Sequence, residues 1–98
     1  MKRKPFEESS GNVFLDIGFP PDEAASLTVR SDLMICLREA IRKRKLTQAK
    51  AARLFGVSQP RISNLMQGKI ELFSTDSLIA MLTRAGMRVG ISVRPRAA

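Results

Sequence analysis

Apolar residues recur at intervals of three and four through residues 22–45, which is the spacing of one helix face. The stretch therefore predicts a long amphipathic helix. Thr28 and Val29 are poor helix formers, so the pattern allows a break near Ser31. The apolar positions that carry the periodicity are Leu27, Leu33, Met34, Ile35, Leu37 and Ile41.

Three shorter helices follow, and each has its own start and stop signals. A hydroxyl residue precedes each one, and such side chains accept hydrogen bonds from the free N–H groups of a first helical turn. A glycine follows each one, where a chain leaves its helix with positive φ. We expect helices over 48–55, over 59–67 and from 75 up to Gly86. The capping residue and its glycine are Thr47 and Gly56, Ser58 and Gly68, and Ser74 or Thr75 and Gly86.

Two segments alternate apolar and polar residues with the period of a strand. Residues 13–17 predict a short strand or extended arm, and residues 88–94, stopped by Pro95, predict a half-buried C-terminal strand. A lone strand leaves its backbone groups unpaired. The C-terminal strand is therefore expected to pair with 13–17 of its own chain or with the same strand of a second copy, and we favour a homodimer.

The chain is expected to fold as one domain, since 98 residues, 44% of them hydrophobic, hold one modest core. Residues 1–11 are charged and polar and predict a flexible arm. Residues 12–98 predict a single all-α domain of four to five helices that ends in the short strand over 88–94.

Residues 47–67 join two of the predicted helices in a pattern typical of a helix-turn-helix. Ala51 and Ala52 are small where the two helices cross, and Gly56 suits the tight turn between them. The positions left exposed carry glutamine, arginine, serine and asparagine, which are side chains that contact base edges and phosphates. The apolar residues that hold the second helix across the first are Phe55, Val57, Ile62 and Leu65.

Charge supports a nucleic-acid partner. The chain has 17 basic and 9 acidic residues and no histidine, a net charge of +8. Residues 1–41 have a net charge of −2, whereas no acidic residue occurs from Arg42 to Lys69. Such asymmetry favours a polyanion, with nucleic acid ahead of an anionic membrane. Because the acid-free block coincides with the helix-turn-helix, double-stranded DNA is the expected partner.

Over residues 46–68 the sequence resembles the Cro/lambda-repressor-like (XRE) helix-turn-helix family. The resemblance implies a lambda-repressor-like fold in which the helix over 59–67 enters the major groove. Glutamine and asparagine can bond adenine in bidentate fashion, and arginine can bond guanine. The residues expected to read bases are Gln59, Arg61, Ser63 and Asn64.

Phosphate contacts are expected beside these base contacts. The family resemblance assigns Gln48, at the start of the preceding helix, to a phosphate. Further candidates for phosphate binding are Ser58, Gln67, Lys69, Lys50 and Arg53.

The order of segments over residues 12–96 resembles the HigA-type antitoxins of bacterial type II toxin–antitoxin systems. The resemblance implies a dimer that represses its own operon at a palindromic operator and neutralises a RelE/HigB-like ribonuclease toxin. Its strong positive charge departs from the acidic character of many antitoxins, and only residues 1–41 could face a basic toxin. A solitary XRE-type or phage-like repressor, and a protein that mainly neutralises a toxin, are the alternatives.

Enzymatic chemistry has few candidate residues. Without histidine and with Cys36 as the single cysteine, neither a common catalytic triad nor a zinc site can be built. We therefore expect no enzyme activity, no metal and no cofactor, and we expect Cys36 to be a small buried hydrophobe. No apolar run exceeds five residues, far short of the ~20 that span a bilayer. A cytoplasmic protein with no membrane partner is expected.

Overall fold

The computed structural model of this chain describes residues 13–95. The predicted flexible arm over 1–11 lies outside the described residues. Within them the chain forms five α-helices, one 3-10 turn and no strand. Their bounds are α2 Val13–Asp16, α3 Pro21–Lys43, α4 Gln48–Phe55, α5 Gln59–Met66, η2 Ile70–Leu72 and α6 Thr75–Arg84.

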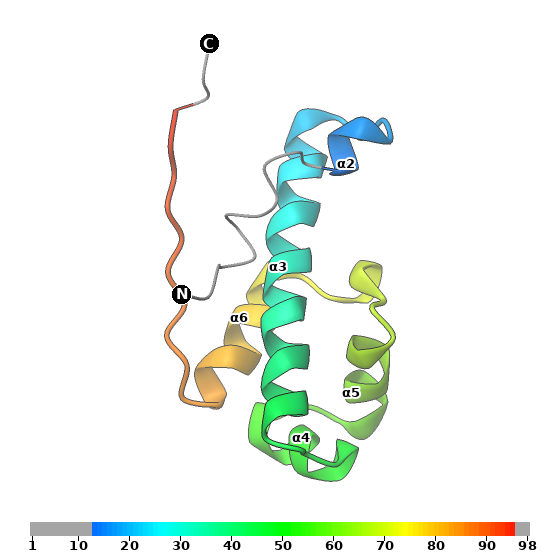
Figure 1. Ribbon diagram of the computed structural model, residues 1–98, viewed down its shortest axis with the longest axis vertical. Helices are drawn as coiled ribbons and strands as arrows, with labels where there is room; N and C mark the ends of the chain where they lie inside the picture. The colour runs from blue at the N-terminus through cyan, green and yellow to red at the C-terminus, as the bar shows by residue number, and fades with distance from the viewer. Residues whose placement is uncertain (1–12, 96–98) are drawn as a thin grey trace.

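Helix α3 is the axis around which the other helices pack (Figure 1). In that view α6 lies on one side of α3 and α5 on the other, while α4 closes the lower end and packs against both. The core lies between α3 and these three helices, and it excludes water almost completely. Its largest fully buried side chains are Phe55, Phe73, Leu37, Ile62, Leu65, Leu78 and Met81.

Helix α3 is continuous, without the break that the sequence pattern allows near Ser31. The Thr28 hydroxyl donates a hydrogen bond to the carbonyl of Ala24 at 2.8 Å, which satisfies this polar group within the helix. The apolar stripe of α3 then packs against α6, and this tertiary contact outweighs the weak helix propensity of two residues.

The first segment is helical, so the prediction of a strand or extended arm over 13–17 is wrong. Helix α2 is followed by a tight turn at Gly18, where φ is +102°, and the N–H of Phe19 donates to the carbonyl of Phe14 at 3.0 Å. This turn brings the rings of Phe14 and Phe19 into edge-to-face contact, with centroids 6.0 Å apart. Leu15 and Ile17, which the strand pattern placed with Val13 on one face, are 41% and 65% exposed.

The capping predictions for the three shorter helices are confirmed. Thr47, Ser58 and Ser74 each precede a helix and accept a hydrogen bond from the backbone N–H three residues later, at 3.1, 3.4 and 3.1 Å. Helix α5 ends at Met66, one residue earlier than expected. The three helices begin where side-chain acceptors satisfy their first turns, as the sequence indicates.

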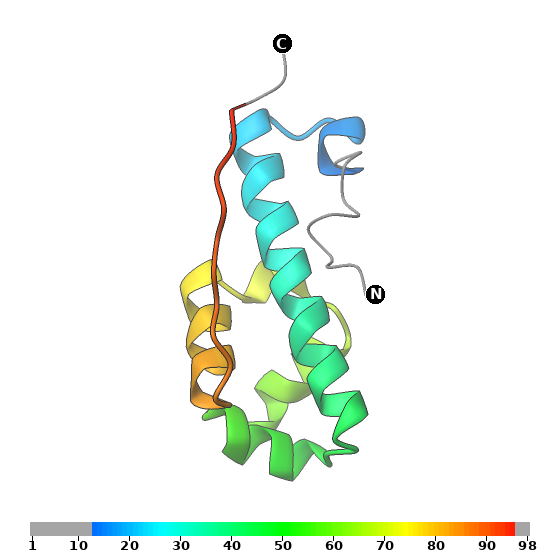
Figure 2. The same ribbon diagram turned by 60° about the vertical axis from the view of Figure 1, so that its left-hand side comes forward.

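Residues 88–94 form no strand, which corrects the predicted C-terminal strand. The segment is extended but pairs with nothing in the described part of the chain, and the candidate partner over 13–17 has been used by helix α2. It runs back along the molecule in the opposite direction to α3, as both ribbon views show (Figures 1 and 2). A strand needs a neighbour for its backbone hydrogen bonds, and this chain alone supplies none among the described residues.

Gly56 is where the chain turns from α4 into α5. Its φ is +73°, a left-handed conformation that costs an L-residue roughly 1–2 kcal/mol. A methyl group added there would lie 2.5 Å from the Cδ atom of Arg84, whose side chain crosses the turn. The backbone conformation therefore requires glycine, whereas the exposed Arg84 side chain could move aside.

We expect Gly56→Ala to lower the free energy of unfolding by about 1–2 kcal/mol, because alanine must adopt that backbone conformation and displace Arg84. Urea unfolding followed by circular dichroism measures the change. Ser26→Ala, at an exposed site of α3, is the control. Equal stability of Gly56→Ala and Ser26→Ala would contradict this account of the turn.

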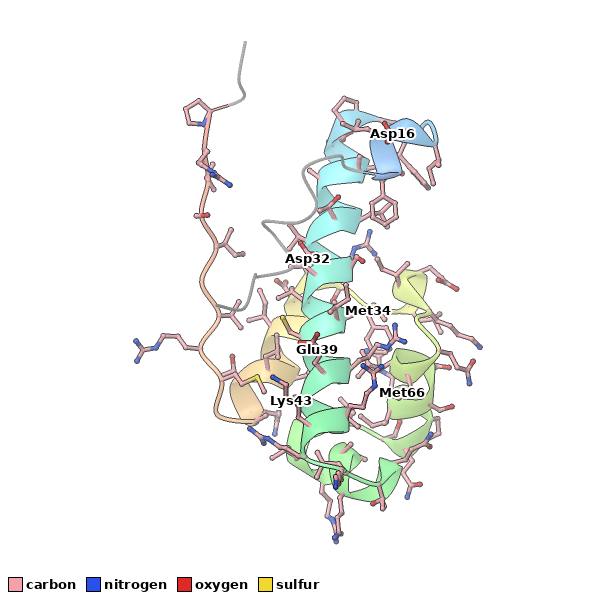
Figure 3. The ribbon with its side chains drawn as sticks, in the orientation of Figure 1. Asp16, Asp32, Met34, Glu39, Lys43 and Met66 are labelled. Carbon is pink, nitrogen blue, oxygen red and sulfur yellow. The ribbon has the colours of Figure 1, made fainter. Side chains whose placement is uncertain are left out.

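Asp32 is the one buried charged residue among those described. It is 4% exposed, and its Oδ2 atom has no hydrogen-bond partner. Figure 3 shows it on the side of α3 away from α5, whereas Met34 lies on the α5 side. Burial raises the pKa of Asp32 above its usual value, because the charged carboxylate loses its hydration.

A raised pKa makes Asp32 destabilising at neutral pH, because between the unfolded and the folded pKa the folded state binds more protons than the unfolded state does. The cost is absent below the unfolded pKa of about 3.9 and grows as pH rises through the folded pKa. We expect Asp32→Asn to raise Tm at pH 7, by roughly 4–8 °C for each kcal/mol gained, and to leave it unchanged near pH 3. Glu39→Gln, on an exposed site of the same helix, is the control. If Asp32→Asn raised Tm by the same amount at both pH values, titration of Asp32 would be ruled out as the cause.

Candidate nucleic-acid interface

The packing of α4 against α5 fixes the geometry of the helix-turn-helix. Ala51 and Ala52 are buried in α4, and Ile62 and Leu65 of α5 have no exposed surface. Small residues on α4 allow a close approach of the two backbones. The burial of Ile62 and Leu65 sets the rotation of α5 about its axis, and thereby decides which of its side chains face solvent.

The outward face of α5 presents neutral polar side chains. Gln59, Ser63 and Gln67 follow one another at intervals of four residues, so they lie in one row along the helix. Asn64 lies beside that row, and Pro60 precedes it by one turn. This face offers amide donors and acceptors, which match the hydrogen-bonding pattern of an adenine edge.

Two members of the row are bonded to each other. The Gln67 side-chain amide donates to the Ser63 hydroxyl at 3.1 Å, which holds both at the solvent surface. The side chains of Gln59 and Asn64 have no hydrogen-bond partner in the described part of the chain. These two amides can therefore pair with bases without breaking a bond in the protein.

Arg61 lies off this face. It precedes the fully buried Leu65 by one helical turn, so its side chain runs along the flank of α5. Its guanidinium stacks 4.0 Å from the ring centroid of Phe73 and donates from Nη1 to the carbonyl of Leu72 at 2.7 Å. The Arg61 side chain is half-buried in these contacts. In the free protein it fastens α5 to the turn that follows.

A second arginine holds the same turn from the other side. Arg30 of α3 donates from Nη1 to the carbonyl of Phe73 at 3.2 Å. The Phe73 ring, 1% exposed, is thus covered by Arg61 while its backbone is bonded to Arg30. Arg30 lies 43 residues from Phe73, so no local pattern in the sequence predicts this contact. For Arg61 a signal existed, because its spacing from Leu65 places it beside the buried face.

The candidate phosphate contacts lie on α4, which packs against α5, and at the two ends of α5. Gln48 lies at the first position of α4, and Lys50 and Arg53 are exposed further along the same helix. Lys69 is exposed just beyond α5. Ser58 already accepts the bond that caps α5, so its hydroxyl hydrogen remains able to reach an anion. These candidates are basic or neutral, and no acidic residue occurs between Arg42 and Lys69.

The environment of Cys36 does not favour a reactive thiol. The side chain is half-buried on α3 and packs against the core, as expected for a small hydrophobe. Burial raises the pKa of the Cys36 thiol, and the charges of Glu39 and Asp32 raise it further. Because the thiolate is the nucleophile, these effects suppress nucleophilic chemistry at neutral pH.

Comparisons with known proteins identify the family. A model of the helix-turn-helix domain family matches residues 13–94, so the chain belongs to that family. A solved structure described as an XRE family transcriptional regulator superposes with a TM-score of 0.70 at 32% identity, over 78% of this chain and 90% of the other. No match was found among curated proteins.

These findings define the class of protein. The family and the fold are those of DNA-binding transcriptional regulators rather than of enzymes. The expected membership of the XRE helix-turn-helix group and the mostly helical fold are confirmed. Among the described residues, no helix is both long and apolar enough to cross a membrane.

We expect Arg61→Ala to lower the free energy of unfolding by about 1–2 kcal/mol in the absence of DNA, since it removes a cation–π contact and a hydrogen bond. Arg61→Lys should be little more stable than Arg61→Ala, because an ammonium group cannot stack on Phe73 as a planar guanidinium does. Urea unfolding measures both. Asn64→Ala, on the outward face, serves as the control and should change stability by no more than about 0.5 kcal/mol. A fully stable Arg61→Ala protein would mean that these contacts contribute nothing.

Proposed function

We propose that this protein is a sequence-specific transcriptional repressor that reads double-stranded DNA through the outward face of α5. The observation that carries the proposal is the row of amide and hydroxyl groups on the solvent side of α5. The burial of Ile62 and Leu65 orients this row, and it lies in a stretch with no acidic residue from Arg42 to Lys69. In this family geometry the start of α5 enters the major groove and α4 crosses the phosphate backbone. A bound protein then occludes the promoter from RNA polymerase.

The proposed base contacts are those expected from the sequence, but Arg61 is less available for them than the other three residues. Gln59 is exposed and Ser63 and Asn64 are partly exposed, and none of them has a partner outside the row, so they can turn to base edges at little cost. Arg61 can do so only by leaving Leu72 and Phe73, which costs the contacts described above. Phosphate contacts are proposed for the surrounding residues Gln48, Lys50, Arg53, Ser58, Gln67 and Lys69.

We further propose that the protein acts as a homodimer at a palindromic operator. Two eight-residue helices contact only a few base pairs, so one copy reads a short half-site. A two-fold dimer places two recognition helices about 34 Å apart, one DNA turn, and doubles the contacts.

A second role, as the antitoxin of a type II toxin–antitoxin pair, is favoured by a different surface. Helix α2 and its turn expose Leu15, Ile17 and Phe19, and this end of α3 lies far from α4 (Figure 1). The segment belongs to the residues with net negative charge, which suits a basic RelE/HigB-like toxin. A toxin bound there would leave α5 free for autoregulation. A solitary regulator would have no such partner.

Selection of bound sequences from random duplex DNA tests the repressor proposal, and we expect a palindromic motif. Asn64→Ala should cost about 1–3 kcal/mol of binding on the selected site and relax one base position in each half. Lys50→Ala is the matched control, and it should weaken binding to all sequences alike. The absence of any enriched motif would contradict sequence-specific recognition.

Binding should also depend strongly on salt, because cations on the protein replace counterions on DNA. If 6 to 10 phosphates are neutralised, affinity should fall by roughly 10³–10⁵ between 50 and 200 mM salt. Fluorescence anisotropy with the selected duplex measures the slope. A complex indifferent to salt would not be held by the proposed phosphate contacts.

For the antitoxin role, we expect a stable complex with a RelE-like protein encoded beside this gene, measured by co-purification. Ile17→Asp should weaken that complex and leave DNA binding intact. Ser26→Asp, on an exposed site of α3, is the control for added charge. If no such neighbouring protein exists, or if it does not bind, the antitoxin role is excluded and the regulator is solitary.

A further inference from the structure

The extended segment over residues 87–95 has backbone groups without partners. Within the described chain, the bond from the N–H of Met87 to the carbonyl of Leu82 is the last backbone hydrogen bond, and none follows it. The segment nevertheless stays extended: it leaves the end of α6 and runs in the opposite direction to α3 in both ribbon views (Figures 1 and 2). An open edge of this kind is a template for pairing with another strand.

The apolar side chains of the segment fall into two groups. Met87 and Val89 are partly buried and pack against the core, whereas Ile91 and Val93 are 57% and 90% exposed. All four share one face, because side chains alternate along an extended chain. One half of this face is therefore anchored on the domain, and the other half projects into solvent.

An open groove of about 470 Å³ lies beside the anchored half. Its walls come from α6 and from the start of the segment. The residues that line it are Ile79, Thr83, Gly86, Met87, Arg88 and Val89. The groove adjoins the apolar face of the segment and has room for an aliphatic side chain from a partner.

We propose that the occupant is the same segment of a second copy, paired antiparallel about a two-fold axis at Gly90. In this register Val93 of the second copy lies opposite Met87 of the first, and Ile91 lies opposite Val89. The two most exposed apolar side chains of one chain thereby meet the anchored residues and the groove of the other. By symmetry the same contacts form twice.

The positions of the arginines favour pairing about Gly90 over pairing about the next residue, Ile91. Pairing about Ile91 would place Arg88 directly opposite Arg94 twice, and like charges in that position are destabilising. Pairing about Gly90 places Arg88 opposite Ser92 and Arg94 opposite Gly86. At the axis itself Gly90 has no side chain, so the two backbones meet without a clash.

The inference deepens the proposed homodimer by naming the surface and the register that would form it. Because it concerns self-association, it can be tested without DNA. Loss of sequence-specific DNA binding would overturn the proposed repressor alone. A monomeric protein would overturn both the proposed homodimer and this pairing, whereas a dimer that uses another surface would overturn the pairing alone.

The first test is the mass of the full-length protein in solution, measured by light scattering after size exclusion. We expect a dimer for the natural sequence and a monomer for the double variant Ile91→Asp/Val93→Asp. Both side chains are exposed, so thermal unfolding should confirm that the variant remains folded. Ser92→Asp, on the opposite face of the segment, is the control and should stay dimeric.

A monomeric natural protein would exclude a second copy and leave the surface to a different partner. A double variant that is still dimeric would show that the dimer uses another surface. Either result overturns the proposal.

The second test fixes the register by disulfide formation in a Cys36→Ser background, which removes the single native cysteine. We expect Gly90→Cys to form a disulfide-linked dimer, since opposed Cα atoms in an antiparallel pair lie about 4.5–5.5 Å apart. Ser92→Cys should not, because the two copies of residue 92 lie four residues out of register, about 14 Å apart. Faster cross-linking of Ile91→Cys or Ser92→Cys than of Gly90→Cys would overturn the Gly90 register.

Discussion

The burial of Ile62 and Leu65 is the constraint on which the interface depends. Neither residue has exposed surface, and together they fix the rotation of α5 against α3 and α4. An eight-residue helix has little stability of its own in water, so its orientation comes from this packing. A different rotation would bury part of the outward row, and the domain would present another set of groups to DNA.

The same rotation explains the two roles of polar residues on α5. Those that point outward are free or bonded only to one another, as Gln67 is to Ser63. Arg61, on the flank, is bonded to Leu72 and stacked on Phe73, where Arg30 holds the backbone from α3. Guanidinium groups thus hold one flank of α5 against the following turn, while its outer face stays exposed to solvent.

The parts of the fold that depend on local chemistry could be predicted from the sequence. The hydroxyl caps at Thr47, Ser58 and Ser74 bond N–H groups within one helical turn. Gly56 is required by the positive φ of the turn in which it lies. The wrong predictions fall where tertiary packing decides. Alternation over 13–17 predicts a strand, but the segment packs against α3 as helix α2, and the contact between Phe14 and Phe19 closes its turn.

The candidate site shows the same limit. Gln59, Ser63 and Asn64 face outward, as the apolar pattern around them indicates. The residue type of Arg61 predicts a base contact, and only its position four residues before the buried Leu65 indicates that it lies on the flank of α5. Its partners at 72 and 73 could not be foreseen, because they depend on how the chain returns after α5. A strand over 88–94 likewise requires a neighbour that one chain does not supply.

The central claim, that DNA is read by the outward face of α5, is tested most directly by amide chemical shifts during titration with a selected duplex. The account predicts that the largest changes fall on Gln48, Gln59, Asn64 and Lys69, with changes at Gln59 and Asn64 lost when the duplex sequence is scrambled. Changes centred instead on α2 or on residues 87–95, with α5 unaffected, would contradict it.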